Sequence, residues 1–139
     1  MYKHAYRVLM ALNLFAVLMV PATQAQSIFL RAEIPFDFAA GNTRLPAGEY
    51  QVKFVSQQAV LIQSKDARSS AVVSTMATQA NKTSDVGKLV FTRYGDQYFL
   101  SKIWSSASDT GRALYKSRLE REVAAQSRVK PAPTAVAAK

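Results

Sequence analysis

The residue types that carry most enzyme chemistry are nearly absent from this sequence. It contains no cysteine, and its single histidine, His4, lies close to the N-terminus. The rest of the chain therefore has no thiol nucleophile, no Cys/His zinc site and no Ser-His-Asp triad. It also lacks a glycine-rich phosphate loop and a calcium-loop pattern, so we expect no metal site and no cofactor.

The carboxylates do not form an obvious catalytic pair. Glu33 and Asp37 are four residues apart in a segment expected to be a strand. That spacing is about 13 Å, too far for the two carboxylates of a glycosidase. Asp66, Asp85 and Asp96 fall in expected turns, where aspartate usually bonds to its own backbone. We therefore expect no catalytic residues and no enzyme, with a carboxylate-based hydrolase as the less favoured alternative.

The segment RYGDQYFLSKIW, residues 93–104, offers a different chemistry, because four aromatic side chains surround a Gly-Asp turn. Such rings could stack on a sugar or an apolar ligand, with charged neighbours supplying polar contacts. The same rings could instead form part of the hydrophobic core, and we favour that interpretation. The candidate ligand contacts are Arg93, Tyr94, Asp96, Tyr98 and Trp104.

A two-residue turn at Gly95 and Asp96 would set the register of this hairpin, with Arg93 opposite Tyr98. Neither face is then purely polar, so we expect both faces to be covered. The C-terminal helix, with Leu119 and Val123, is the expected lid on one side. One face would carry Leu89, Phe91, Tyr98, Leu100 and Trp104, and the other Val90, Tyr94, Phe99 and Ile103.

The first 25 residues match the pattern of a secretory signal. A basic start that includes Lys3 leads into an apolar run of 13 residues, 8–20, and then into small residues that end at Ala25. An uncleaved anchor is the less favoured alternative, because Asn13 interrupts the run and a membrane-spanning helix needs about 20 residues. We expect cleavage after Ala25 and a periplasmic or secreted protein.

Positive charge is concentrated near the C-terminus. Without residues 1–25, 16 of the 18 basic residues remain against 9 acidic ones, a net charge of +7, and residues 113–139 hold 6 basic and 2 acidic residues. In an exported protein this favours an anionic envelope polymer or lipid headgroups as partner over nucleic acid. A solvated segment that only aids solubility is equally compatible. The candidate polyanion contacts are Lys116, Arg118, Arg121, Arg128 and Lys130.

Short alternating segments separated by turn residues indicate an all-β fold. Residues 28–38 alternate apolar and polar side chains, and Pro35 marks an edge position or a break into two strands. The pattern predicts a small antiparallel barrel or sandwich of about six or seven strands with a short C-terminal helix. The further strands are expected at 45–55, 59–64, 69–76, 88–94 and 97–104.

The composition changes after Trp104. Residues 105–116 have no clean period and are expected to be a loop, and Ser117 with Glu120 forms a capping box that predicts a short helix. The Pro/Ala-rich end is expected to be disordered. We expect the β domain to fold without residues 113–139. The predicted organisation is a signal peptide at 1–25, an antiparallel β domain at 26–112, a helical segment at 113–128 and a disordered tail at 129–139.

Four motifs resemble those of a group of small exported bacterial β-domain proteins with no assigned activity. The motifs are PFDF at 35–38, LPAGEYQV at 45–52, KLVFTRYGDQYFLSKIW at 88–104 and SDTGR at 108–112. The resemblance spans most of residues 28–122. It implies a shared β domain and brings no activity with it.

The sequence therefore favours an exported, non-enzymatic β domain that acts as a structural or binding component of the cell envelope. The alternative is a carrier or sensor for a small apolar or sugar ligand. An apolar cavity open beside Tyr94 and Trp104 would favour this alternative, whereas a filled interior would favour the first interpretation.

The signal pattern leads to a direct prediction. Protein recovered from the periplasm or the medium should begin at Gln26, because the peptidase binds the small residues before that position. N-terminal sequencing checks this, and recovered protein that still begins at Met1 would contradict it.

Overall fold

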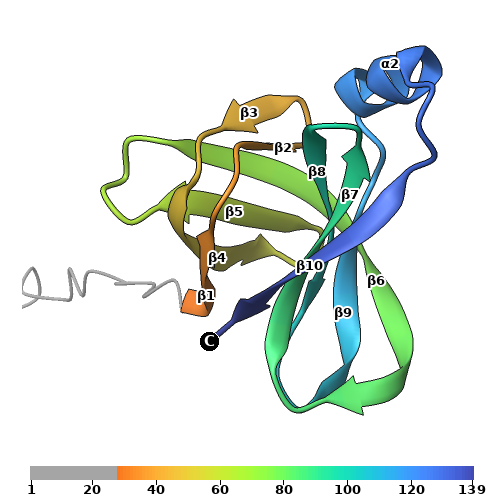
Figure 1. Cartoon of the computed structure of the whole chain (residues 1–139). Helices are drawn as coiled ribbons and strands as arrows, with labels where there is room; N and C mark the ends of the chain where they lie inside the picture. The colour runs from red at the N-terminus through yellow and green to blue at the C-terminus, as the bar shows by residue number, and fades with distance from the viewer. Residues whose placement is uncertain (1–27) are drawn as a thin grey trace, which may run out of the picture.

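The computed structural model describes residues 28–139, so the predicted signal peptide and its cleavage site lie outside the described residues. This part of the chain is almost entirely β, with one short helix near its C-terminal end, as the sequence predicted (Figure 1). The expected six or seven strands are too few, because ten are present. They are β1 Ile28–Ile34, β2 Phe38–Ala40, β3 Thr43–Leu45, β4 Gly48–Ser56, β5 Ala59–Ser64, β6 Ser70–Ser84, β7 Gly87–Tyr94, β8 Gln97–Trp104, β9 Ser108–Leu114 and β10 Ala132–Ala138, with helix α2 at Arg118–Gln126.

The first strands follow the predicted alternation. In β1, Leu30, Ala32 and Ile34 are buried, whereas Arg31 and Glu33 are exposed. β1 ends just before Pro35, which cannot donate a ladder hydrogen bond, and β2 begins three residues later. The segment 28–38 is therefore split into two strands, one of the two outcomes expected.

The strands form one curved sheet that does not close into a complete barrel (Figure 1). Its order is β1-β4-β5-β6-β9-β8, after which β8 borders both β7 and the short β2–β3 hairpin, and β10 pairs with β7. All ladders are antiparallel except the short β2–β8 contact. β1 and β10 meet at a seam, where Arg31 and Lys139 exchange two backbone hydrogen bonds of 2.8 Å. The expected closed barrel or sandwich is thus corrected to a single open sheet.

Two segments predicted as loop are strands instead. β6 continues through residues 77–84, and β9 occupies 108–114, so Ala113 and Leu114 belong to the sheet and not to the helical segment. Many side chains in these segments are exposed, so the sequence shows no hydrophobic period there. The two strands are held together largely by backbone hydrogen bonds. The sequence pattern had no signal for them.

The expected disordered tail forms β10, which is the largest correction. Seven residues of β10 pair with β7, Ala138 is buried, and Val136 packs against the main core. Pro133 is tolerated because the alternation of the strand turns its nitrogen away from β7. Residues 113–139 therefore include two pieces of the sheet and are not a dispensable extension.

A β-bulge decides which side chains of the hairpin face the core. The predicted register holds at the turn, where Arg93 pairs with Tyr98 and Gly95 has a φ of 64°. Beyond it, Phe91 pairs with Leu100 and Val90 with Lys102, so Ser101 is an extra residue whose hydroxyl donates to the carbonyl oxygen of Val90.

The bulge exchanges the expected faces of the last two apolar residues of β8. Ile103 turns into the main core, while Trp104 packs over Gly111 outside it. The main core also contains Leu89, Phe91 and Leu100, as expected for that face. A second, smaller cluster of Ala39, Tyr94 and Phe99 is covered by Leu119, Val123 and Ala124 of α2, which confirms the predicted lid.

Removing residues 130–139 should destabilise the whole sheet. The truncation uncovers the edge of β7 and loses the burial of Val136 and Ala138, so the free energy of unfolding should fall by about 3 kcal/mol. Urea unfolding followed by the fluorescence of Trp104, the single tryptophan, measures this. Val129→Ser, at a side chain that is 60% exposed, is the control and should leave the midpoint unchanged. An unchanged midpoint for the truncated chain would show that β10 contributes nothing.

Candidate functional site

The five predicted ligand contacts do not form one site. Asp96 and Tyr98 line a surface groove beside the β7–β8 turn, and Arg93 lies over the ring of Tyr98, 5.5 Å from its centre. Tyr94 belongs to the second cluster beneath α2, and Trp104 lies at the other end of β8. The structure therefore brings three of these residues together and places the other two elsewhere.

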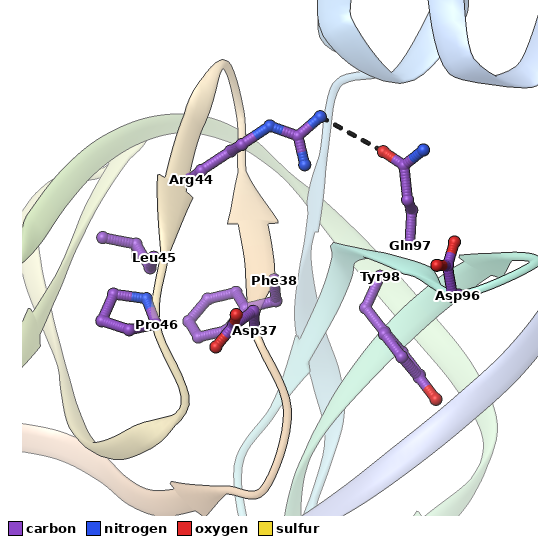
Figure 2. Close-up of a pocket in the computed structure, with 8 residues that line it drawn as sticks. All are labelled: Asp37, Phe38, Arg44, Leu45, Pro46, Asp96, Gln97 and Tyr98. Carbon is purple, nitrogen blue, oxygen red and sulfur yellow. Dashed lines mark hydrogen bonds between the residues drawn. The ribbon is translucent and has the colours of Figure 1, made fainter.

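The groove has a volume of about 280 Å³ and lies between the β2–β3 hairpin and the β7–β8 turn. Figure 2 shows Asp37 and Asp96 on separate elements at opposite sides of it. The Arg44 guanidinium donates to Gln97 Oε1 over 3.2 Å and joins the two sides. Asp37 accepts a hydrogen bond from the backbone of Ala47 and so fixes the turn before β4. Its carboxylate therefore has a structural partner.

The ring of Tyr98 is already engaged within the protein. It stacks on Phe36 with ring centres 3.8 Å apart, and Phe36 in turn packs edge-on against Phe91. With Arg93 also close to the ring, Tyr98 has little aromatic surface left for a ligand. The interpretation of these aromatics as core residues therefore holds for Tyr98 and Phe99, which is 2% exposed.

Tyr94 and Glu120 form a buried polar pair between the hairpin and α2. Tyr94 is 4% exposed and Glu120 is 5% exposed, and the Tyr94 hydroxyl donates to Glu120 Oε1 over 3.1 Å. Ser117 caps the helix as predicted by accepting from the backbone of Glu120. The side chain of Glu120 bonds to Tyr94 instead of to the backbone of Ser117, so only the serine half of the predicted capping box is found among residues 28–139.

Burial shifts the ionisation of both partners. Desolvation raises the pKa of Glu120 above its ordinary value, although the hydrogen bond from Tyr94 and the charge of Lys116 act in the opposite direction. Desolvation and the neighbouring carboxylate both raise the pKa of Tyr94. Tyr94 therefore remains a neutral donor near neutral pH, and its hydroxyl is not available to an external ligand.

Trp104 is only 8% exposed, and the hollow beside it has a volume of about 100 Å³. That hollow is far smaller than the pockets that hold drug-sized ligands. With Tyr94 covered by α2, no open apolar cavity joins these two residues in the part of the chain that the structure describes.

Five of the six basic residues of 113–139 gather with others from the sheet at one end of the molecule, which we call the cationic end. The backbone of Leu119 donates to Asn42 Oδ1 and brings α2 to the β2–β3 turn, while Ala132 pairs with Arg93. Figure 1 shows α2 above the β2–β3 hairpin and the β7–β8 turn. The cationic end comprises Arg44, Arg93, Lys116, Arg118, Arg121, Arg128 and Lys130.

The predicted polyanion contacts differ in how free their charges are. Arg118 pairs with Glu122 at 3.0 Å, and Lys116 acts on the buried Glu120. Arg121, Arg128 and Lys130 are exposed and form no ion pair with any of residues 28–139. These three are the free cations of the predicted set.

Sequence reasoning missed Arg44 and Arg93 as members of the cationic end. They are distant from residues 113–139 in the chain, and only the fold places them there. The nearest local signal was Asn42, which lies between β2 and β3, because asparagine side chains often bind backbone groups at turns and helix starts.

Residues 28–139 contain no group of three or more acidic, histidine or cysteine side chains that could hold a metal ion. None of the helical structure described there is long and apolar enough to cross a membrane.

Comparison of the chain with protein-family models, with curated proteins and with solved structures found no match. The resemblance to the group of small exported β-domain proteins therefore remains a prediction.

The Tyr94–Glu120 pair gives a pH-dependent prediction. Tyr94→Phe removes the donor to a buried carboxylate and should lower the free energy of unfolding by about 1–3 kcal/mol near neutral pH. Because the folded pKa of Glu120 is raised, its stabilising contribution is largest at acid pH and falls as pH rises through that pKa. The loss in Tyr94→Phe should therefore be smaller at about pH 4, where Glu120 is protonated, than at about pH 8.

Urea unfolding at both pH values tests this prediction. Tyr115→Phe, which removes a hydroxyl from a residue that is 57% exposed, is the matched control. A Tyr94→Phe deficit that is the same at both pH values would mean that Glu120 does not respond to this hydrogen bond.

Proposed function

We propose that this protein is an exported, non-enzymatic β domain that acts as a binding component of the cell envelope and holds an anionic polymer at its cationic end. The proposal is supported by the net charge of +7 over residues 26–139 and by the gathering of seven cations at one end. Electrostatic attraction to a polyanion releases its counterions and needs no deep pocket.

The observation that carries the proposal is the excess of cations over exposed carboxylates at this end, where seven basic side chains stand against Asp96 and Glu122. Of the 16 basic residues in 28–139, only Lys65, Arg68 and Arg118 are in ion pairs. Glu120, in the middle of the cationic end, is buried and bound to Tyr94, so it presents little charge to solvent. The surface field there is consequently positive.

The apolar side of α2 is buried within the protein, and this favours a polymer over a lipid bilayer as the binding partner. An interfacial helix binds a membrane by inserting its apolar residues between the lipids. In α2 these residues, Leu119, Val123 and Ala124, pack on the second cluster of the protein itself. The helix therefore offers the outside mainly charge.

A carrier or sensor for a sugar is the second candidate. The groove of Figure 2 supports it, because Asp37, Arg44, Asp96 and Gln97 place polar groups around a space of about 280 Å³. The engaged ring of Tyr98 and the covered positions of Tyr94 and Trp104 argue for the polymer instead.

Removing the free cations should abolish most of the binding. Arg121→Gln, Arg128→Gln and Lys130→Gln together should lower retention on isolated cell-wall material about tenfold at low salt, because three unpaired charges are lost. Retention of the unaltered protein should itself weaken as salt is raised. Sedimentation with the wall material measures both effects.

A matched control removes the same charge elsewhere. Lys82→Gln, Lys88→Gln and Lys102→Gln change three cations on β6, β7 and β8. Lys82 and Lys88 flank the turn between β6 and β7, and Figure 1 shows this turn at the end of the molecule remote from α2. This variant should be retained almost as well as the unaltered protein. Equal losses for both triple variants would contradict a specific cationic end, and preferential retention on anionic lipid vesicles would contradict the polymer.

A further inference from the structure

A second groove, separate from the cationic end, lies where β6 changes partners. Ser74 pairs with Ala59 on β5, and the next residue, Thr75, pairs with Leu114 on β9. At this corner the backbone of Thr75 donates to the carbonyl oxygen of Gln58, at the β4–β5 turn. The parting of β5 from β9 leaves a groove of about 500 Å³ lined by Gln57, Gln58, Thr75, Met76, Arg112 and Tyr115.

Arg112 places a fixed cation in this groove. Its guanidinium donates to the carbonyl oxygen of Gln57 over 2.6 Å and lies 5.4 Å from the centre of the Phe54 ring. These contacts hold the planar group in one position, yet no carboxylate pairs with it anywhere in residues 28–139. Its other N–H groups have no hydrogen-bond partner in that range. A fixed, planar and unpaired guanidinium is suited to bidentate binding of a carboxylate.

Thr75 adds an independent sign of a missing partner. It is 2% exposed and lines the groove, and its hydroxyl has no hydrogen-bond partner among the described residues. Buried hydroxyls are normally bonded, because an unmade hydrogen bond costs about 1–3 kcal/mol. The hydroxyl oxygen is covered in this structure, so a ligand hydroxyl would have to displace a neighbouring side chain to bond with it.

The remaining lining residues suit a sugar ring. Tyr115 is 57% exposed and can stack on the apolar face of a ring, with the exposed Met76 alongside. Gln57 and Gln58 carry exposed side-chain amides that both donate and accept hydrogen bonds. Aromatic surface, amides and one unpaired arginine together match a hydroxylated ring that carries a carboxylate.

We propose that this groove binds a uronic acid residue of an acidic polysaccharide, with the carboxylate on Arg112 and the ring against Tyr115. The proposal goes beyond the charge-driven capture at the cationic end, because it selects the sugar as well as the charge. A bare phosphate would use Arg112 and leave the amides, Thr75 and Tyr115 without a role.

Titration of the full exported protein with tetragalacturonate tests the site. Calorimetry should detect binding, and amide NMR signals of residues 57–58, 75–77 and 112–115 should move. Arg112→Lys keeps the charge but removes the planar fork, and it should weaken binding about tenfold. Tyr115→Ala, at an exposed position with little risk to folding, should weaken it about fivefold.

Controls separate this proposal from the preceding one. In the triple variant Arg121→Gln, Arg128→Gln and Lys130→Gln, the amide signals of residues 57–58, 75–77 and 112–115 should still move when tetragalacturonate is added, since the three altered residues lie outside the groove. Neutral maltotetraose should bind at least tenfold more weakly, and inorganic phosphate should not compete at equal concentration. Unchanged affinity in both Arg112→Lys and Tyr115→Ala, no detectable binding, or equal binding of maltotetraose or phosphate would each overturn the uronic acid site.

Discussion

The structure depends on one constraint, which is that the β7–β8 hairpin has apolar side chains on both faces. Phe91 and Leu100 need the main core, while Tyr94 and Phe99 need a second cover. A sheet with water on one side cannot satisfy both requirements. Helix α2 supplies the second cover, although it has only nine residues and would be marginal alone. Its position, the burial of Glu120 and the outward direction of its arginines all follow from this requirement.

Burying Glu120 has a further effect on the surface. The glutamate of a capping box usually accepts a hydrogen bond from the backbone of the N-cap residue, and its charge then stays at the helix start. Here it accepts from Tyr94 beneath the helix, and this bond ties the helix to the hairpin. The same contact therefore stabilises the lid and removes a negative charge from the cationic end. Packing and electrostatics are coupled through one side chain.

The sequence predicted those parts of the fold in which side chains alternate against a core. The strands near 28–38, 45–55, 59–64 and 88–104, the Gly95 turn and the α2 lid are all found in the structure. It missed β9, β10 and the second half of β6, because many side chains of these segments are exposed and leave no period to read. The bulge at Ser101 was equally invisible, since one extra residue changes the face of Trp104 without changing composition. The two grooves and the full cationic end needed the tertiary arrangement, because their residues are distant in the chain.

The seam between β1 and β10 has a consequence for the time course of folding. Arg31 and Lys139 come from opposite ends of the described chain, yet their backbones exchange two hydrogen bonds. Bringing such distant segments together costs loop-closure entropy before any contact compensates for it, so chains of this type fold more slowly than those built from neighbouring contacts. The last strand can join the sheet only after β7 has been placed. A polypeptide with this topology therefore stays unfolded for longer after synthesis than a chain of the same length in which neighbouring segments pair.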